Sequence, residues 1–160
     1  MEIEMDFKQR MADERYMQAA LAEARAAARD GEIPVGAVVV SADGRIIGQA
    51  HNMTEALTDV TAHAEMLAIT AAANSYGAKY LTDCTLYVTV EPCLMCAGAI
   101  GWSQLRRIVV GCGDDKRGYR CQCSRSPFHP KATVTYGILA DDCAALMTAF
   151  FRHRRKQPSR

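Results

Sequence analysis

The sequence has little net charge, few aromatic side chains and no long apolar run. Its 19 lysines and arginines almost balance 18 acidic residues, which leaves a net charge of +1. The chain as a whole therefore lacks the basic excess of many nucleic-acid-binding proteins, so any such binding must come from local patches. No stretch is long enough to span a membrane, which argues against a membrane protein.

A disulfide framework is also absent from the pattern. The seven cysteines are an odd number, and neither their spacing nor the length of 160 residues is typical of a disulfide scaffold. Residues 1–6 are mostly acidic or apolar but contain no signal-peptide core. We therefore expect a cytoplasmic protein with reduced cysteines.

The length and the 49% hydrophobic content predict a single domain over residues 1–160. Residues 1–8 are charged and precede any clear periodicity, so we expect a loosely ordered leader there. Residues 9–30 are rich in strong helix formers and predict a helix that ends at Gly31. Residues 157–160 form a basic tail.

The rest of the chain alternates between strand and helix patterns. Two apolar runs flank Asp43 and Gly44 and predict a hairpin over residues 35–50. Further strands are predicted over residues 85–90, 107–111 and 132–137, and further helices over residues 62–76, 92–103 and from about 140 onward. Residues 114–130 show no periodicity and predict a long loop, which is often functional. This order indicates an α/β domain with helices on both sides of a sheet.

Two short motifs, far apart in the sequence, contain the residues that point to chemistry. His63 and Glu65 lie in the first motif, and Cys93 and Cys96 lie in the second. One imidazole and two thiolates are the ligands of a zinc site whose fourth position stays open for water. Glu65 then remains free to carry protons beside that water. The motifs predict one active site with zinc on His63, Cys93 and Cys96.

The spacing of these residues restricts where the metal lies. The two cysteines are three apart and share one face of a helix, and Pro92 fits the first turn of that helix. His63 and Glu65 are two apart, which on a helix means roughly 200° of rotation. Both can reach the metal if it lies beyond the N-terminal end of a helix capped near Thr61. We therefore predict two helix N-termini pointing at one zinc ion.

The sequence resembles the bacterial tRNA-specific adenosine deaminases, members of the cytidine deaminase superfamily, whose zinc signature is His-x-Glu followed by Pro-Cys-x-x-Cys. The resemblance runs from about Tyr16 to Arg155. It is clearest in residues 32–38, 61–65, 86–99, 137–139 and 150–151. It implies a three-layer α/β/α cytidine deaminase-like fold with a five-stranded mixed sheet, and a homodimer with active sites near the subunit interface.

The reaction that this resemblance implies is zinc-dependent hydrolytic deamination of adenosine to inosine at the wobble position, with a tRNA anticodon stem-loop as partner. Glu65 matches the proton shuttle of the family. Asn52 matches a residue that contacts the flipped base, and Asp114 and Lys116 fall in a segment similar to one that the family uses for substrate. The loop over residues 119–128 departs from the family pattern at the place where the family approaches RNA.

Other interpretations remain open at the level of sequence. The shared zinc chemistry also suits a deaminase of a free nucleobase or nucleoside, of the guanine or cytosine type, and a zinc-stabilised binding module without activity is a further alternative. Cys121 and Cys123 would then complete a structural site. Asn52 would cap the turn after the second strand. The basic residues 152–160 suit either an RNA contact or a solvated helix end.

Overall fold

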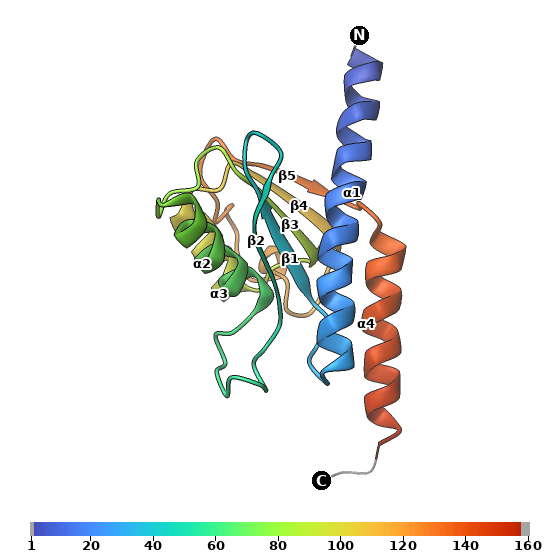
Figure 1. Ribbon diagram of the computed structural model, residues 1–160. Coiled ribbons are helices and arrows are strands. Elements are labelled where there is room, and N and C mark those ends of the chain that lie inside the picture. The colour runs from blue at the N-terminus through green and yellow to red at the C-terminus, as the bar shows by residue number, and fades with distance from the viewer. Residues whose placement is uncertain (1, 158–160) are drawn as a thin grey trace.

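The computed structural model describes residues 2–157 and shows a sheet between two pairs of helices (Figure 1). Helices α1 (Glu2–Arg29) and α4 (Ala140–Arg155) cover one face of the sheet, and α2 (Ala64–Tyr76) and α3 (Leu94–Ser103) cover the other. This arrangement confirms the predicted three-layer α/β/α fold. None of the described helices is both long enough and apolar enough to cross a membrane.

The sheet has five strands in the order β2-β1-β3-β4-β5. Their bounds are Gly36–Val40, Ile46–His51, Thr85–Val90, Arg107–Cys112 and Thr133–Tyr136, for β1 to β5. Strand β1 pairs antiparallel with both β2 and β3, while β3, β4 and β5 run parallel. Parallel neighbours need a crossover connection, which α3 supplies between β3 and β4. The mixed sheet and the hairpin therefore match the sequence prediction.

Alternating side chains of β1 show how the two layers of core form. Ala37 and Val39 join the cluster beneath α2 and α3, whereas Val38 and Val40 join the cluster beneath α1 and α4. Both faces of the strand are buried, as expected for a sheet covered by helices on both sides. Helix α1 contributes five fully buried residues at helical spacing, namely Met17, Ala20, Leu21, Ala24 and Ala27.

The N-terminal helix is longer than the sequence predicted. It begins at Glu2, so residues 2–8, expected as a loosely ordered leader, are helical. These residues extend α1 beyond the other elements (Figure 1). The side chain of Phe7 is exposed there. Most of the predicted basic tail, residues 158–160, lies outside the described residues.

Helices α2 and α3 begin later than predicted. The predicted N-cap Thr61 is wrong, because Thr61 donates both its backbone N–H and its hydroxyl to Asp59 in the preceding turn. The N-cap is His63, and the N-cap of α3 is Cys93 rather than a residue before Pro92. Two of the predicted metal ligands therefore occupy the positions where helices start.

Candidate active site

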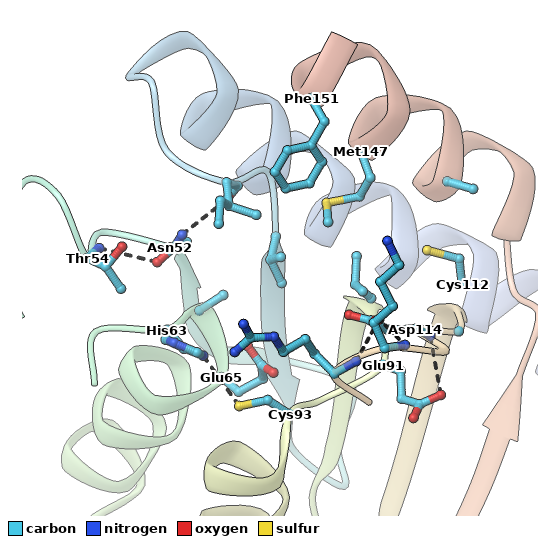
Figure 2. Close-up of a pocket in the computed structure, with 18 of the residues that line it drawn as sticks. Asn52, Thr54, His63, Glu65, Glu91, Cys93, Cys112, Asp114, Met147 and Phe151 are labelled. Carbon is cyan, nitrogen blue, oxygen red and sulfur yellow. Dashed lines mark hydrogen bonds between the residues drawn. The ribbon is translucent and has the colours of Figure 1, made fainter. Parts of the chain in front are cut away.

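The predicted site residues meet at the carboxyl ends of the parallel strands. Strand β3 ends at Val90 and leads through Glu91 and Pro92 into α3, and the N-terminus of α2 approaches from the hairpin side. Figure 2 shows His63 and Cys93 facing each other, with Glu65 beside them. Open α/β sheets commonly place their sites at this edge, because the strand ends and helix starts leave backbone groups free there.

The three predicted ligands have the geometry that zinc requires. The Nδ1 atom of His63 lies 3.6 Å from Sγ of Cys93 and 3.5 Å from Sγ of Cys96. A tetrahedral zinc ion with ordinary Zn–N and Zn–S bond lengths needs a separation of about 3.6 Å between nitrogen and sulfur ligands. The donor atoms lie within 4.8 Å of one another, so one ion fits between them.

The cluster of His63, Cys93 and Cys96, called the metal group below, has no fourth protein ligand among the described residues. Within residues 2–157, no other group of three or more His, Cys, Asp or Glu side chains is arranged to hold a metal. Cys121 and Cys123 lie outside the group, and both are free. An open position is typical of catalytic rather than structural zinc sites.

The two thiols interact strongly with each other. A hydrogen bond with Cys96 lowers the pKa of Cys93 to about 4. The same pairing, together with burial, raises the pKa of Cys96. A metal must therefore displace the proton that remains on Cys96, and its binding releases that proton to solvent.

Glu65 lies beside the three predicted ligands without being one of them. It is the second residue of α2, only 4% exposed, and lies outside the metal group while lining the same cavity. Burial raises the pKa of its carboxyl group to about 7. A carboxyl group with such a pKa can both accept and donate a proton near neutral pH.

The metal group opens into a cavity of about 1350 Å³, to which Asn52 contributes one wall (Figure 2). The Oδ1 atom of Asn52 accepts from the backbone N–H of Thr54 at 3.2 Å, and its Nδ2 donates to the carbonyl of Ile33 at 3.4 Å. The turn-capping role left open by the sequence is therefore present. The fixed amide keeps one N–H and one lone pair for a ligand.

A loop after β4 forms another wall and contains Asp114 and Lys116, both of which line the cavity. The Oδ1 atom of Asp114 accepts from the backbone N–H groups of Lys116 and Arg117, each at 3.0 Å. Asp114 therefore shapes the loop. A short helical turn, Tyr119–Cys121, follows within the long segment that the sequence predicted as a loop.

The sequence did not predict that helix α4 lines the same cavity. Met147, Phe151, Arg154 and Arg155 all contribute to its wall, and Figure 2 shows Met147 and Phe151 directed toward it from α4. These residues follow the zinc motifs by more than fifty positions. The sequence did show that the last turn of α4 is basic. Basic residues there suit a ligand-binding surface and a solvent-exposed helix end equally well, so they did not identify this wall of the cavity.

A family model for the cytidine and deoxycytidylate deaminase zinc-binding region matches residues 10–112, which include both zinc motifs. The chain therefore belongs to the cytidine and deoxycytidylate deaminase family, the zinc-dependent deaminases that the site geometry indicates. Within this family it is 42% identical, over 153 residues, to the tRNA-specific adenosine deaminase of Bacillus subtilis. That match spans 91% of this chain and 92% of the relative.

Solved structures give the same result. One, from a study of A-to-I editing by tRNA:A34 deaminases at the wobble position of transfer RNA, has a TM-score of 0.76 and 40% identity, covering 82% of this chain and 98% of that one. Guanine deaminase from Nitrosomonas europaea has a TM-score of 0.72 and 28% identity, covering 86% and 83%. The fold is shared by both kinds of deaminase, while the sequence is closer to the first.

Proposed function

We propose that this enzyme hydrolyses adenosine to inosine at the wobble position of a tRNA anticodon and releases ammonia. The observation that carries this proposal is the cationic wall of the cavity: Lys116, Arg117, Arg154 and Arg155 line the same cavity as the metal group and Glu65. A free base has no phosphate to attract four cations, whereas an anticodon loop has several. The relatives named above support the same substrate.

Each part of the site has a defined role in this reaction. Zinc, when bound by His63, Cys93 and Cys96, supplies the activated water of the hydrolysis. Glu65 takes a proton from that water and delivers it to the ring nitrogen next to the amine-bearing carbon. The remaining hydroxide adds to that carbon, and Glu65 then moves the second proton of the water from the new hydroxyl group to the amine, which leaves as ammonia. Burial of Glu65 suits this exchange, because neither of its protonation states is strongly favoured at neutral pH.

Asn52, Asp114 and Lys116 are proposed to act on the substrate. The amide of Asn52 is held by its own turn, so its remaining N–H and lone pair meet the edge of the flipped base without further ordering. Asp114 keeps the loop folded so that Lys116 lines the cavity. Lys116 is then available to bind a phosphate of the anticodon loop.

A deaminase of a free nucleobase is the second candidate, favoured by the structural similarity to guanine deaminase. One assay separates the two candidates. The zinc-loaded protein is incubated with an anticodon stem-loop that contains wobble adenosine and, in parallel, with free guanine, cytosine and their nucleosides. We expect inosine in the RNA only. Turnover of a free base, with none in RNA, would replace our proposal by the second candidate.

We also propose that the enzyme is a homodimer that covers helix α3. Trp102 is 83% exposed, and Leu94 and Met95 are also exposed on the same helix. Met95 lines the cavity, so a second copy placed here would help to enclose the site. Sedimentation velocity would test this, since Trp102→Glu should shift the protein to monomer.

We also propose a cytoplasmic location, which the free state of all seven cysteines supports, because thiols stay reduced in that compartment.

A further inference from the structure

Residue Glu91 links the metal-binding segment to the loop that forms the opposite wall of the cavity. It follows β3 directly and precedes Pro92 and the ligand Cys93. Its side chain is 1% exposed, yet it lines the cavity, and no metal-binding role accounts for it. A buried carboxylate is costly unless it is paired and hydrogen-bonded. Its partners therefore define what it does.

All the partners described for the Glu91 carboxylate come from the loop after β4. Its Oε1 atom accepts from Nε of Arg120 at 2.9 Å and pairs with Nη2 of Arg120 at 2.7 Å. Oε2 accepts from the backbone N–H of Arg120 at 3.2 Å, and the N–H of Asp114 approaches Oε1 at 3.5 Å. One carboxylate thus holds both ends of the segment from Asp114 to Arg120.

The loop passes directly over this carboxylate. A Cβ atom added to Gly118 would lie 1.8 Å from Oε2 of Glu91, so only glycine fits there. The neighbouring backbone is bonded to the metal-binding segment, because Tyr119 donates to the carbonyl of Pro92 at 2.9 Å and Gly118 forms a β-bridge with Cys93. Residues 114–118 are therefore fixed at both ends.

Arg120 is held on its second side by aromatic residues. Its guanidinium lies 3.7 Å from the centre of the Tyr136 ring, and the Tyr136 hydroxyl donates to the hydroxyl of Tyr119 at 2.7 Å. A planar guanidinium suits both the fork on Glu91 and the ring of Tyr136, which lysine would not. Because Glu91 already neutralises it, Arg120 is poorly placed to serve as a free phosphate-binding charge.

We infer that Arg120 is a positioning residue for the RNA substrate: through Glu91 it holds the loop over residues 113–118 so that Lys116 and Arg117 line the cavity. This inference rests on the proposed function. The metal ligands have independent support from α2 and α3, so loosening the loop weakens substrate binding and leaves the chemistry intact. Arg120 lies in the loop over residues 119–128, where this sequence differs from the pattern of the tRNA-specific adenosine deaminases that it resembles.

The test measures kcat and KM on the wobble-adenosine stem-loop for the wild type, Arg120→Ala, Arg120→Lys and the control Arg10→Ala. Arg10 lies on α1, its side chain is 71% exposed, and it does not line the cavity. For Arg120→Ala we expect KM to rise about 10-fold, with kcat within about 2-fold of wild type and one zinc per chain. Arg120→Lys keeps the charge but loses the fork, so most of the defect should remain.

Trypsin cleavage after Lys116 and Arg117 provides a readout that does not depend on the substrate. We expect faster cleavage there in Arg120→Ala and Arg120→Lys than in the wild type or Arg10→Ala. If Arg120→Ala fails to fold, Arg120→Lys still decides the outcome. A wild-type enzyme that makes no inosine would overturn the proposed function, while the trypsin result would still decide whether Arg120 holds the loop.

Three results would overturn the inference. A wild-type KM in Arg120→Lys would show that only the charge matters. A smaller salt dependence of RNA binding in Arg120→Ala, with trypsin cleavage after Lys116 and Arg117 as slow as in the wild type, would show that Arg120 contacts RNA directly and does not hold the loop. A loss of zinc or a fall in kcat with KM unchanged would show that the pair supports the metal centre instead.

Discussion

Two walls of one cavity are held in place in different ways. The metal ligands lie at or just inside the starts of α2 and α3, where the helical backbone fixes them. The opposite loop, residues 113–121, contains only one short helical turn and depends on the Glu91 carboxylate and the Arg120 side chain. The metal ligands are thus positioned by secondary structure, whereas the opposite loop depends on side-chain contacts in addition to its backbone bonds to the metal-binding segment.

Because of this difference, the loop can change without moving the metal ligands. A ligand at a helix N-cap moves only if the helix moves, and α2 and α3 pack on the sheet through a buried core. The loop can change shape when a single contact changes, because few buried apolar groups hold it. A family with one chemistry can therefore accept different substrates by altering this wall, which agrees with the shared fold of adenosine and guanine deaminases.

Breaking the metal-binding wall should have the largest effect. Cys96→Ala removes a buried ligand, so we expect zinc to fall well below one per chain and deamination to become undetectable. In the wild type, chelation should abolish activity and added zinc should restore it. Metal content by mass spectrometry and inosine formation are measured together. Full activity of metal-free enzyme would disprove the role assigned to the group. Cys143→Ala, a buried cysteine outside it, is the matched control.

Glu65→Gln should separate the metal from the proton shuttle. The amide is nearly isosteric but cannot carry a proton, so turnover should fall at least about 100-fold while zinc remains at one per chain. The control Glu14→Gln changes an exposed carboxyl group and should keep full activity. Near-normal turnover by the Glu65 variant would mean that another group moves the proton.

The sequence predicted the regular part of the site because that part depends on local patterns. The hairpin followed from Asp43 and Gly44, and the two helix starts at the metal followed from the spacing of His63 with Glu65 and of Cys93 with Cys96. Each of these depends on residues that are neighbours along the chain. The starts of α2 and α3 were each predicted two residues too early. For α2 the reason is that Asp59 binds Thr61 in a turn that helix propensity does not reveal.

The loop and the wall formed by α4 could not be predicted in the same way. The partners of Glu91 are 23 and 29 residues away in the sequence, and no periodicity links them. Arg154 reaches the cavity only because α4 packs beside α1 on the sheet. Long-range contacts of this kind are set by tertiary packing, which a single sequence does not encode as a local signal.

The face of the sheet that α1 covers, opposite to the face that carries α2 and α3, offers a control. A change there should alter the stability of the protein but not the site. Asp13 of α1 pairs with Arg107 through two contacts of 2.6 Å and accepts from the Tyr87 hydroxyl at 2.8 Å. Asp13→Asn should lower the free energy of unfolding by about 3 kcal/mol, because Arg107 loses its partner in a largely buried position. Denaturant titration measures this. The variant should keep wild-type KM and zinc content, whereas a raised KM would show that the two faces are coupled.

The same pair predicts a pH dependence of stability. Burial alone would raise the pKa of Asp13, but hydrogen bonds from Arg107 and Tyr87 outweigh it and hold the pKa below its usual value. The stabilisation is therefore present above the ordinary pKa of about 4 and is lost as pH falls through the lower pKa of the folded state. Asp13→Asn should show a shallower loss of stability below pH about 4. An identical acid slope in both proteins would mean that other carboxyl groups dominate.

We expect the smallest effect from removing the cationic residues at the end of α4, which tests whether they bind RNA together with the loop over residues 113–118. Arg154 and Arg155 line the cavity, whereas Arg152 on the same helix does not. Replacing both cavity arginines with Ala should reduce the slope of log KM for RNA against log salt by roughly 1.4, because each phosphate contact to a single strand contributes about 0.7. Arg152→Ala should leave the slope unchanged. An unchanged slope in the double variant would mean that the basic last turn of α4 is a solvated helix end and that the loop alone binds phosphate.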